Sequence, residues 1–352
     1  MSELTFNRRL TDINGSISAI GSETLIEKAF LVSKELTSYI DDLKLQLKKL
    51  INSDSINDKN FHQRKLHGLA WYATYAEVLK SVSSWAYELG VEKKFGALER
   101  LILILGFNEY LHQLRGGILM SQNEFIRPDE LDINKSFFKI LSSENIMFFL
   151  EIGEIEILKN QFINLVKEHS SSSTIGNDGL NEDQKIIREQ FFKFSKDKIE
   201  PRAHSWHLED ELIPLEIIDQ LAQMGVFGLT IPEIYGGVGL DKISMCVVSE
   251  ELSRGYIGVG SLATRTDIAS ELILCGGSDA QKEKWLPRIA NGEIIPTAVF
   301  TEPNVGSDLG SLQTRAKLVG DHYQVTGNKT WITHAARADL MTLLARTNSE
   351  FD

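Results

Sequence analysis

A loop of turn-forming and hydroxyl residues near the end of the chain carries the groups best suited to bind a ligand. Its sequence, TEPNVGSD, spans residues 301–308 and follows the apolar run Pro296–Phe300, which predicts a buried strand. Gly306 permits a close approach of the main chain, so the N–H groups beside it can form a concave anion site. The hydroxyls of Thr301 and Ser307 add hydrogen-bond donors. By spacing alone, the same residues also fit a plain turn.

Three short runs with strand character follow this loop. They are Arg315–Val319, His322–Thr326 and Thr330–Thr333, and the two-residue links Gly320-Asp321 and Gly327-Asn328 separate them. Links of this kind close β-hairpins, so the segment predicts a small antiparallel sheet with the polar loop at one end.

The third run offers an aromatic surface. In a strand, Trp331 and Thr333 point to the same side, on either side of Ile332. A flat aromatic face with hydroxyl and amide donors suits a flavin ring, which needs one covered face and hydrogen bonds to its nitrogen and carbonyl atoms.

The sequences of these segments resemble those of one enzyme family. TEPNVGSD, followed by GDHYQVTGNKTWIT, resembles the flavin-binding segment of acyl-CoA dehydrogenases, and SDAQKEKWLPRIANGEIIPTAVF resembles the stretch before it. The resemblance covers about residues 181–345, and Val305 departs from the small residue usual in the family. It implies an acyl-CoA substrate that Ser307 also contacts. It implies FAD held by seven residues, Phe300, Thr301, Gly306, Ser307, Trp331, Ile332 and Thr333.

The family chemistry is the α,β-oxidation of an acyl-CoA. A carboxylate base removes the α-proton, hydride leaves the β-carbon for the flavin, and hydrogen bonds to the thioester carbonyl stabilise the developing enolate. In the family the base is a glutamate on a helical bundle that follows the β-domain. No residue here matches it, and Glu302 belongs to the flavin loop. We therefore assign no catalytic residue, expect the base beyond Asp352, and expect the chain to be the N-terminal portion of a longer protein.

Further segments narrow the resemblance. LHGLAWYATYAEVLK, GGILMSQNEFIRP and TWITHAARADLMTLLART resemble the members that oxidise (2S)-methylsuccinyl-CoA to mesaconyl-CoA in the ethylmalonyl-CoA pathway. The resemblance implies electron-transferring flavoprotein as electron acceptor and a homo-oligomer. This substrate has a free carboxylate, which needs a partner when buried. Arg265 lies on the helix whose family counterpart faces the acyl end, so we expect it to clamp that carboxylate. A surface salt bridge with Asp267 or a neighbour is the alternative.

Three other functions stay open at this point. The chain could belong to another branched-chain or dicarboxylic acyl-CoA dehydrogenase. It could belong to a flavin monooxygenase or nitroalkane oxidase with the same fold, which would consume oxygen. It could also be an inactive fragment or a helical docking module that binds no flavin.

The predicted fold class is mostly helical with one β segment. Residues 1–169 predict a helical extension, 170–180 a Ser/Gly/Asn-rich linker, 181–295 the N-terminal helical domain of the family, and 296–352 the start of its middle β-domain, with no C-terminal bundle in these residues.

The expected helices follow from apolar spacing and end signals. The first begins at the capping pair Thr24 and Glu27, and a turn segment is expected up to Pro128. The remaining expected helices are Phe61–Leu89, Ala97–Leu114, one or two between Lys135 and Glu168, Asp183–Ile199 ending before Pro201, Pro214–Met224, Lys242–Arg254, Gly260–Cys275 and Asp279–Ile289.

Composition argues against several classes of function. A net charge of −12 disfavours a nucleic-acid surface, which needs clustered Lys and Arg. No apolar run approaches the roughly 20 residues of a membrane span, and no secretory signal is visible, so we expect a cytoplasmic protein.

Cys246 and Cys275 are expected to be reduced, mostly buried thiols. His204 and His207 with Asp210 could be drawn as a metal cluster, but the segment is short and lacks a convincing third ligand, so we expect no metal site.

Overall fold

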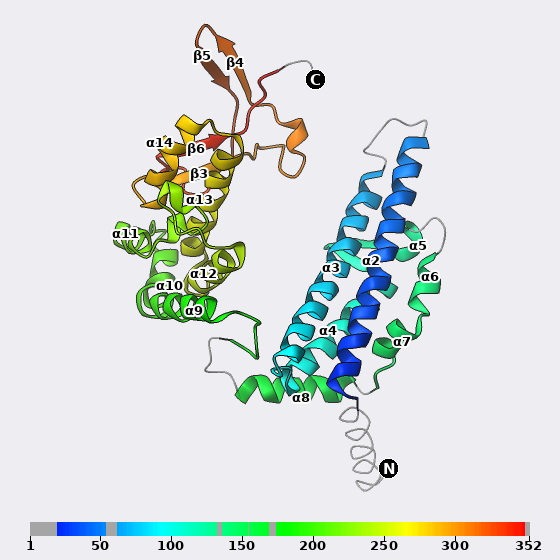
Figure 1. Cartoon of the computed structure of the whole chain (residues 1–352). Coiled ribbons are helices and arrows are strands. Elements are labelled where there is room, and N and C mark those ends of the chain that lie inside the picture. Colours follow the sequence, from blue (N-terminus) through cyan, green and yellow to red (C-terminus); the bar gives the residue numbers. More distant parts are fainter. Residues whose placement is uncertain (1–19, 54–61, 132–135, 154, 169–173, 349–352) are drawn as a thin grey trace. The chain divides into compact units, whose positions relative to one another are not determined.

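The computed structural model divides the chain into two compact units, Met1–Gly179 and Leu180–Asp352 (Figure 1). The boundary falls inside the segment expected to be a linker. The structure describes residues 20–53, 62–131, 136–153, 155–168 and 174–348. Part of the expected linker lies outside these described residues, as do His169 and most of residues 52–60, a polar stretch that the sequence predicts to link the first two helices.

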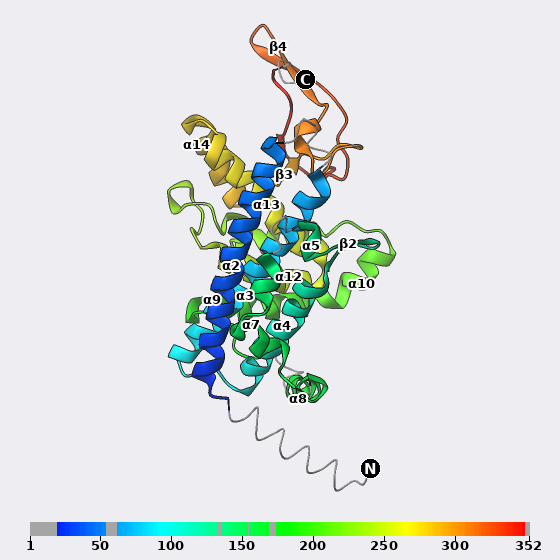
Figure 2. The same ribbon diagram turned by 90° about the vertical axis from the view of Figure 1, so that its right-hand side faces the viewer.

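Three long helices form the centre of the first unit. They are α2 (Ser22–Ser53), α3 (Gln63–Val91) and α4 (Ala97–Gly116), and they run alongside one another (Figures 1 and 2). The predicted start at Thr24 is wrong, because α2 begins two residues earlier and places Thr24 inside its first turn. The apolar stripe of α2 is buried as its spacing predicts: Leu25, Ala29, Val32, Leu36, Ile40, Leu43 and Leu47.

A small hairpin replaces the turn segment expected up to Pro128. Strand β1 (Ile118–Ser121) pairs antiparallel with β2 (Glu124–Ile126), so the expectation of an all-helical first unit is wrong in this place. The physical reason is burial, because Ile118 and Ile126 are fully buried and anchor the hairpin on the helices. The shorter helices that follow are α5 (Pro128–Leu131), α6 (Ser136–Leu141), α7 (Glu144–Leu150) and α8 (Ile155–Glu168).

The second unit opens with a helix that does not stop where the sequence predicts. Helix α9 (Glu182–Phe194) continues through the π-helical turn Ser195–Ile199 into α10 (Glu200–Leu208). Pro201 therefore lies near the start of α10 instead of ending a helix. The π-helical turn directly before Pro201 accommodates the proline: there the N–H of Glu200 donates to the Ser195 carbonyl, five residues back, so the regular i→i−4 pattern is already interrupted. Trp206 of α10 is 1% exposed, and this burial rewards the continuation.

Four further helices complete the helical part of this unit. They are α11 (Leu215–Gln223), α12 (Lys242–Gly255), α13 (Ile257–Gly276) and α14 (Asp279–Ala290), each within three residues of its predicted bounds. Helices α12 and α13 pack very closely at Gly260, where a Cβ atom would lie 2.0 Å from the Ser253 hydroxyl.

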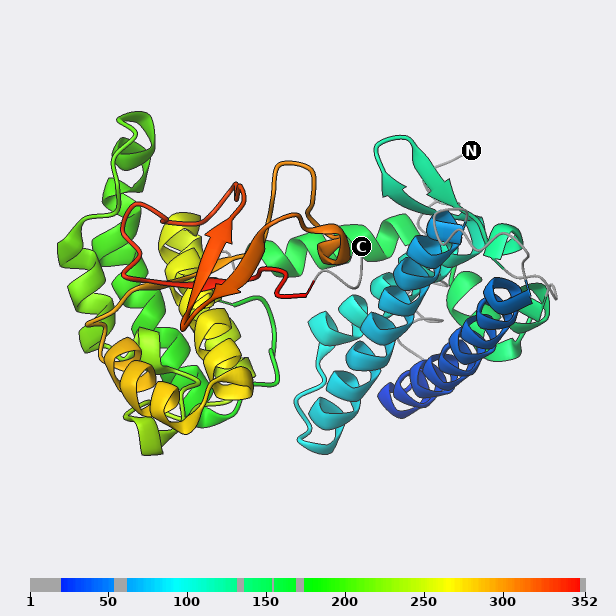
Figure 3. The same cartoon turned by 90° about the horizontal axis from the view of Figure 1, so that it is seen from above.

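Four strands form two separate pairs instead of one antiparallel sheet. Strand β4 (Arg315–Val319) pairs antiparallel with β5 (His322–Thr326), as predicted, and Figure 3 shows this hairpin in orange. Strand β3 (Pro296–Val299) pairs in parallel with β6 (Leu340–Leu343). The predicted strand Thr330–Thr333 is wrong, because these residues form no ladder and lead into a turn.

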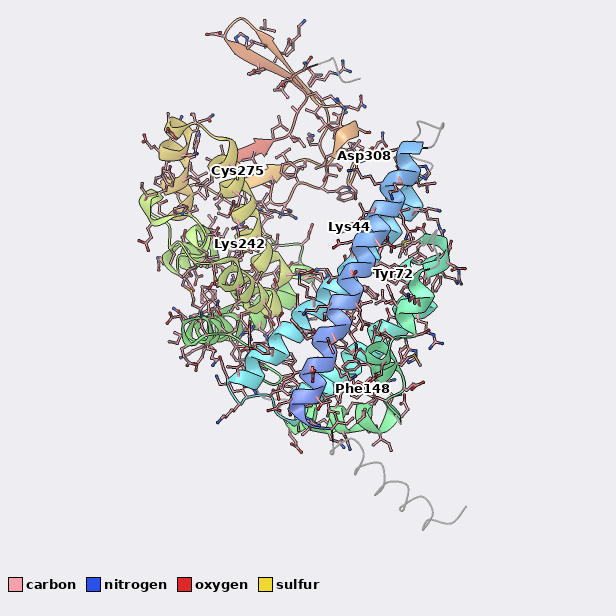
Figure 4. All side chains as sticks on the ribbon, turned by 45° about the vertical axis from the view of Figure 1, so that its right-hand side comes forward. Lys44, Tyr72, Phe148, Lys242, Cys275 and Asp308 are labelled. Carbon is pink, nitrogen blue, oxygen red and sulfur yellow. The ribbon has the colours of Figure 1, made fainter. Side chains whose placement is uncertain are left out.

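The predicted fold class, mostly helical with a late β segment, is confirmed. The prediction of buried cysteines is wrong, since Cys246 and Cys275 are both free and exposed. Figure 4 labels Cys275, in the last turn of α13, where the helix faces solvent. In the part of the chain that the structure describes, no helix has the length and apolar character needed to cross a bilayer. The same residues contain no cluster of three potential metal ligands.

Candidate functional site

The polar loop after β3 folds back on itself in a tight turn. The main-chain N–H of Glu302 donates to the carbonyl of Val305 at 2.9 Å, and the N–H of Val305 donates to the carbonyl of Glu302 at 3.1 Å. Val305 is only 8% exposed, so the valine at this position packs inside the fold and anchors the turn.

The Glu302 side chain is a buried anchor for the segments around this loop. Its carboxylate accepts the main-chain N–H groups of Gln313 and Thr314 at 2.6 and 2.8 Å and the Lys329 ammonium at 3.0 Å. The Thr314 hydroxyl lies nearby but has no hydrogen-bond partner among the described residues. This hydroxyl and the donors named above together lower the pKa of Glu302 to about 2. A carboxylate held so firmly in the charged form is unsuited to the role of general base.

Two contacts join the start of the loop to the segment that carries the tryptophan. The Lys329 ammonium donates to the Phe300 carbonyl at 2.8 Å, and the N–H of Thr330 donates to the Thr301 carbonyl at 3.0 Å. The structure therefore brings Phe300 and Thr301 next to the residue that precedes Trp331. The side chain of Phe300 lines a groove of about 370 Å³ between α13, α14 and β6.

Trp331 is presented to the outside by an unusual main-chain conformation. Its φ angle is 58°, in the left-handed region that residues other than glycine rarely adopt, and its side chain is 88% exposed. Ile332, the next residue, is half-buried, and its carbonyl accepts the N–H of Ala335 at 3.3 Å. A strained residue that exposes a large aromatic ring is typical of a binding site.

Thr333 is held at two points. Its carbonyl accepts the buried Thr297 hydroxyl of β3 at 2.9 Å, and its own hydroxyl accepts the Nε–H of Arg265 at 3.1 Å. The half-buried Arg265 comes from α13, so the helical domain and the β segment meet here.

The alternative partner for Arg265 is engaged elsewhere. Asp267 accepts the Lys242 ammonium at 2.8 Å and the Thr230 hydroxyl, and Figure 4 labels Lys242 on α12. Within the described ranges, no carboxylate lies within 4.0 Å of the Arg265 guanidinium, so the predicted surface salt bridge with Asp267 is not formed.

His334 is a member of this cluster that sequence reasoning missed. A ring nitrogen, Nε2, lies 3.0 Å from the Pro296 carbonyl, while Nδ1 is buried and has no partner among the described residues. Burial lowers the pKa of His334, the charges of Arg265 and Arg337 lower it further, and the bond to Pro296 opposes them. Arg337 in turn donates to the Ile213 carbonyl. A single histidine without ligand spacing carries no signal in the sequence.

Gly306 and Ser307 lie on the exposed side of the loop. Apart from its two chain neighbours, no described residue has a heavy atom within 4 Å of the position that a Cβ on Gly306 would occupy, and Gly306 does not have a positive φ angle. Ser307 is exposed and forms no hydrogen bond to any described residue. The next residue, Asp308 (labelled in Figure 4), accepts the Ser311 hydroxyl at 2.6 Å. The described part of the chain therefore uses neither the space beside Gly306 nor the Ser307 hydroxyl.

Comparison with protein-family models accounts for the second unit. Residues 181–293 match the acyl-CoA dehydrogenase N-terminal domain, and residues 297–352 match the acyl-CoA dehydrogenase middle domain. The second unit therefore has the N-terminal and middle domains of the acyl-CoA dehydrogenase family. The two matched domains meet between α14 and β3, just before the strand that leads into the polar loop.

Individual relatives differ in how much of this chain they match. A (2S)-methylsuccinyl-CoA dehydrogenase of Cereibacter sphaeroides is 50% identical over 319 residues, which are 90% of this chain and 58% of the relative. A mitochondrial isovaleryl-CoA dehydrogenase of Bos taurus is 39% identical over 173 residues, 48% of this chain and 40% of the relative. A solved glutaryl-CoA dehydrogenase of Mycobacterium smegmatis is 34% identical, with a TM-score of 0.46 over 48% of this chain and 44% of its own. The chain thus spans about two fifths to three fifths of these relatives.

Proposed function

We propose that this chain is part of an FAD-dependent acyl-CoA dehydrogenase that oxidises (2S)-methylsuccinyl-CoA to mesaconyl-CoA in the ethylmalonyl-CoA pathway. The extent of one match carries the proposal. Residues 180–352 are about half of the chain, so a match over 90% of it must run through most of the first unit as well. The isovaleryl-CoA dehydrogenase matches only about half of the chain. The shared helical unit therefore favours the methylsuccinyl-CoA enzyme among these relatives.

Several groups that the fold leaves free fit a flavin. Trp331 exposes its ring, Thr333 has one hydroxyl hydrogen to donate, Ser307 has an unused hydroxyl, and Gly306 has open space beside it. With Phe300, Thr301 and Ile332 they are the residues that would hold FAD. When bound, FAD supplies the acceptor for the hydride that leaves the substrate.

In the proposed reaction, the residues of this chain bind and orient the flavin and the substrate. Trp331 would cover part of the flavin and exclude water from that face, and Thr333 and Ser307 would donate hydrogen bonds to it. Ser307 also contacts the acyl-CoA. Among the described residues we propose none as the base that removes the α-proton.

Arg265 supplies the selectivity for a dicarboxylic acyl group in this proposal. Its Nε–H is used by Thr333, but its two terminal nitrogens form no hydrogen bond to the described residues. A half-buried guanidinium without a carboxylate partner is well suited to a ligand carboxylate, because its planar fork matches the two oxygens.

The partners follow from the same proposal. We expect electron-transferring flavoprotein to accept the electrons and the protein to form a homo-oligomer, as the family resemblance implies. We also expect the protein in the cytoplasm, as the sequence pattern predicts. These three properties stay predictions.

Purification of the complete protein followed by substrate profiling tests the proposal. We expect a yellow protein that reduces an artificial electron acceptor with (2S)-methylsuccinyl-CoA faster than with isovaleryl-CoA or glutaryl-CoA. Oxygen consumption without an acceptor would instead identify a monooxygenase or oxidase. A colourless protein that does not take up FAD would leave only the docking-module alternative.

A variant tests the carboxylate clamp separately. Arg265→Ala should raise KM for methylsuccinyl-CoA by at least tenfold and change KM for isovaleryl-CoA little, because only the first substrate has a carboxylate to pair. Arg288→Ala serves as the control, because it removes an exposed ion pair between Arg288 of α14 and Glu293, which follows that helix. An equal rise in KM for both substrates would show that Arg265 does not read the carboxylate.

A further inference from the structure

The hydrogen bond between Arg265 and Thr333 has a fixed direction. A guanidinium has only donors, so the Thr333 hydroxyl must be the acceptor in the 3.1 Å contact with Arg265 Nε. The single hydrogen of that hydroxyl is then left for another acceptor. Among the described residues Thr333 donates to none, so its hydrogen is available to a ligand.

The position of the hydroxyl is also fixed. The Thr333 carbonyl accepts the hydroxyl of Thr297, which is fully buried on β3. The following residue, His334, has a φ angle of 43° and contacts the Pro296 carbonyl on the same strand at 3.0 Å. Arg265 approaches from α13, a separate element. Contacts from two elements therefore hold Thr333, so the direction in which it donates is set before a ligand arrives.

We propose that Arg265 is a positioning residue that orients and polarises the Thr333 hydroxyl as a hydrogen-bond donor to the flavin. This inference rests on the proposed flavin site and assigns Arg265 a task there besides its contact with the substrate. Arg265 does not itself touch the flavin in this role.

The charge of Arg265 determines the expected effect. A hydroxyl that accepts from a cation becomes a stronger donor, because chains of hydrogen bonds polarise one another in a medium of low dielectric. Reduced flavin carries more electron density on its ring acceptors than oxidised flavin does. A polarised donor therefore stabilises the reduced form more and raises the reduction potential of the bound flavin.

A double-mutant cycle on the complete holoenzyme tests this. The wild type, Arg265→Ala, Thr333→Val and the double variant are equilibrated with a reference redox dye, without substrate, and the flavin absorbance gives the reduced fraction. Arg265→Ala should lower the ratio of reduced to oxidised flavin about tenfold at a given potential, which is a shift of about 30 mV for a two-electron couple. In the Thr333→Val background the same change should have no further effect, because the group through which Arg265 acts is gone.

The outcomes separate this inference from the proposed function. A wild-type protein that binds no flavin overturns both. A flavoprotein whose potential is unchanged in Arg265→Ala, or shifts equally with and without the Thr333 hydroxyl, overturns only the role of Arg265. Arg265→Met, which keeps an unbranched stem without charge or donor, carries the same test if the alanine variant does not fold. The affinity of the apoprotein for FAD, measured by quenching of FAD fluorescence, should also fall in Arg265→Ala. In the Thr333→Val background, Arg265→Ala should cause no further loss of affinity.

Discussion

Replacing Gly327 by alanine should destabilise the β segment without touching the ligand site. A Cβ on Gly327 would lie 2.3 Å from the Thr314 hydroxyl oxygen and 2.7 Å from the Thr314 Cα, whereas ordinary contacts begin near 3.4 Å. The Cα belongs to the main chain, so a side-chain rotation cannot relieve the contact. Thr314 is 2% exposed and its N–H donates to Glu302, so it has little room to move.

The size of the effect follows from two opposing terms. Overpacking in a well-packed site costs about 1–3 kcal/mol. Alanine also restricts the unfolded chain, which returns about 0.4–1 kcal/mol. We expect a net loss of about 1–2 kcal/mol in the free energy of unfolding. In a urea titration of the complete apoprotein followed by circular dichroism, the midpoint should fall by about 0.5 M.

Gly306→Ala is the matched control for this prediction. It adds the same methyl group in the same β segment, but no atom lies within 4 Å of the new Cβ and the φ angle is not positive. Its urea midpoint should equal that of the wild type, while its affinity for FAD should fall because the methyl group occupies the space left for the ligand. A Gly327→Ala midpoint indistinguishable from that of Gly306→Ala would show that the crowding at Thr314 relaxes without cost.

Three further predictions concern the second unit. Folding lowers the pKa of His334, so the folded state binds fewer protons than the unfolded state, and the free energy of unfolding should fall as pH drops below about 6.5. In urea titrations at several pH values, His334→Gln should make this fall in stability less steep. Folding lowers the pKa of Glu302 to about 2, so the contribution of its carboxylate to the free energy of unfolding is full above pH 4.5 and is lost as pH falls towards 2. Glu302→Gln should therefore make the free energy of unfolding depend less on pH between 4.5 and 2. Trp206→Ala should cost about 3–5 kcal/mol, because Trp206 is 1% exposed, whereas Leu208→Ala, at a side chain that is 70% exposed, should change stability by less than about 0.5 kcal/mol.

Helical periodicity made most of the first unit predictable, and local sequence rules failed where packing overrode them. The buried stripe of α2 could be read directly from its spacing. The continuation of α9 past Ile199 could not, because Pro201 is a helix breaker in isolation and only the burial of Trp206 rewards the π-helical turn. The hairpin of β1 and β2 was missed for the same reason, since two short strands gain stability only from the helices on which they pack.

The candidate site divides along the same line. Residue types and their order were enough to single out the polar loop, Trp331 and Thr333, because glycine, hydroxyl and aromatic groups carry their chemistry wherever they lie. Arg265 was singled out only through the family resemblance of its helix. The sequence misplaced Trp331 and Thr333 on a strand, because β propensity cannot show that Trp331 adopts a left-handed φ of 58°. The partner of Arg265 was equally hidden.

Only the tertiary structure could decide which of these groups meet. Arg265 and Thr333 are 68 positions apart, and their contact depends on how α13 packs against β3 and on the turn after Trp331. Asp267 lies two positions from Arg265, yet its contacts with Lys242 and Thr230 take it out of reach as a partner. Spacing along a chain determines which face of a helix a residue occupies. Which other residues reach that face depends on the burial of apolar surface over the whole unit, and short-range patterns do not contain that information.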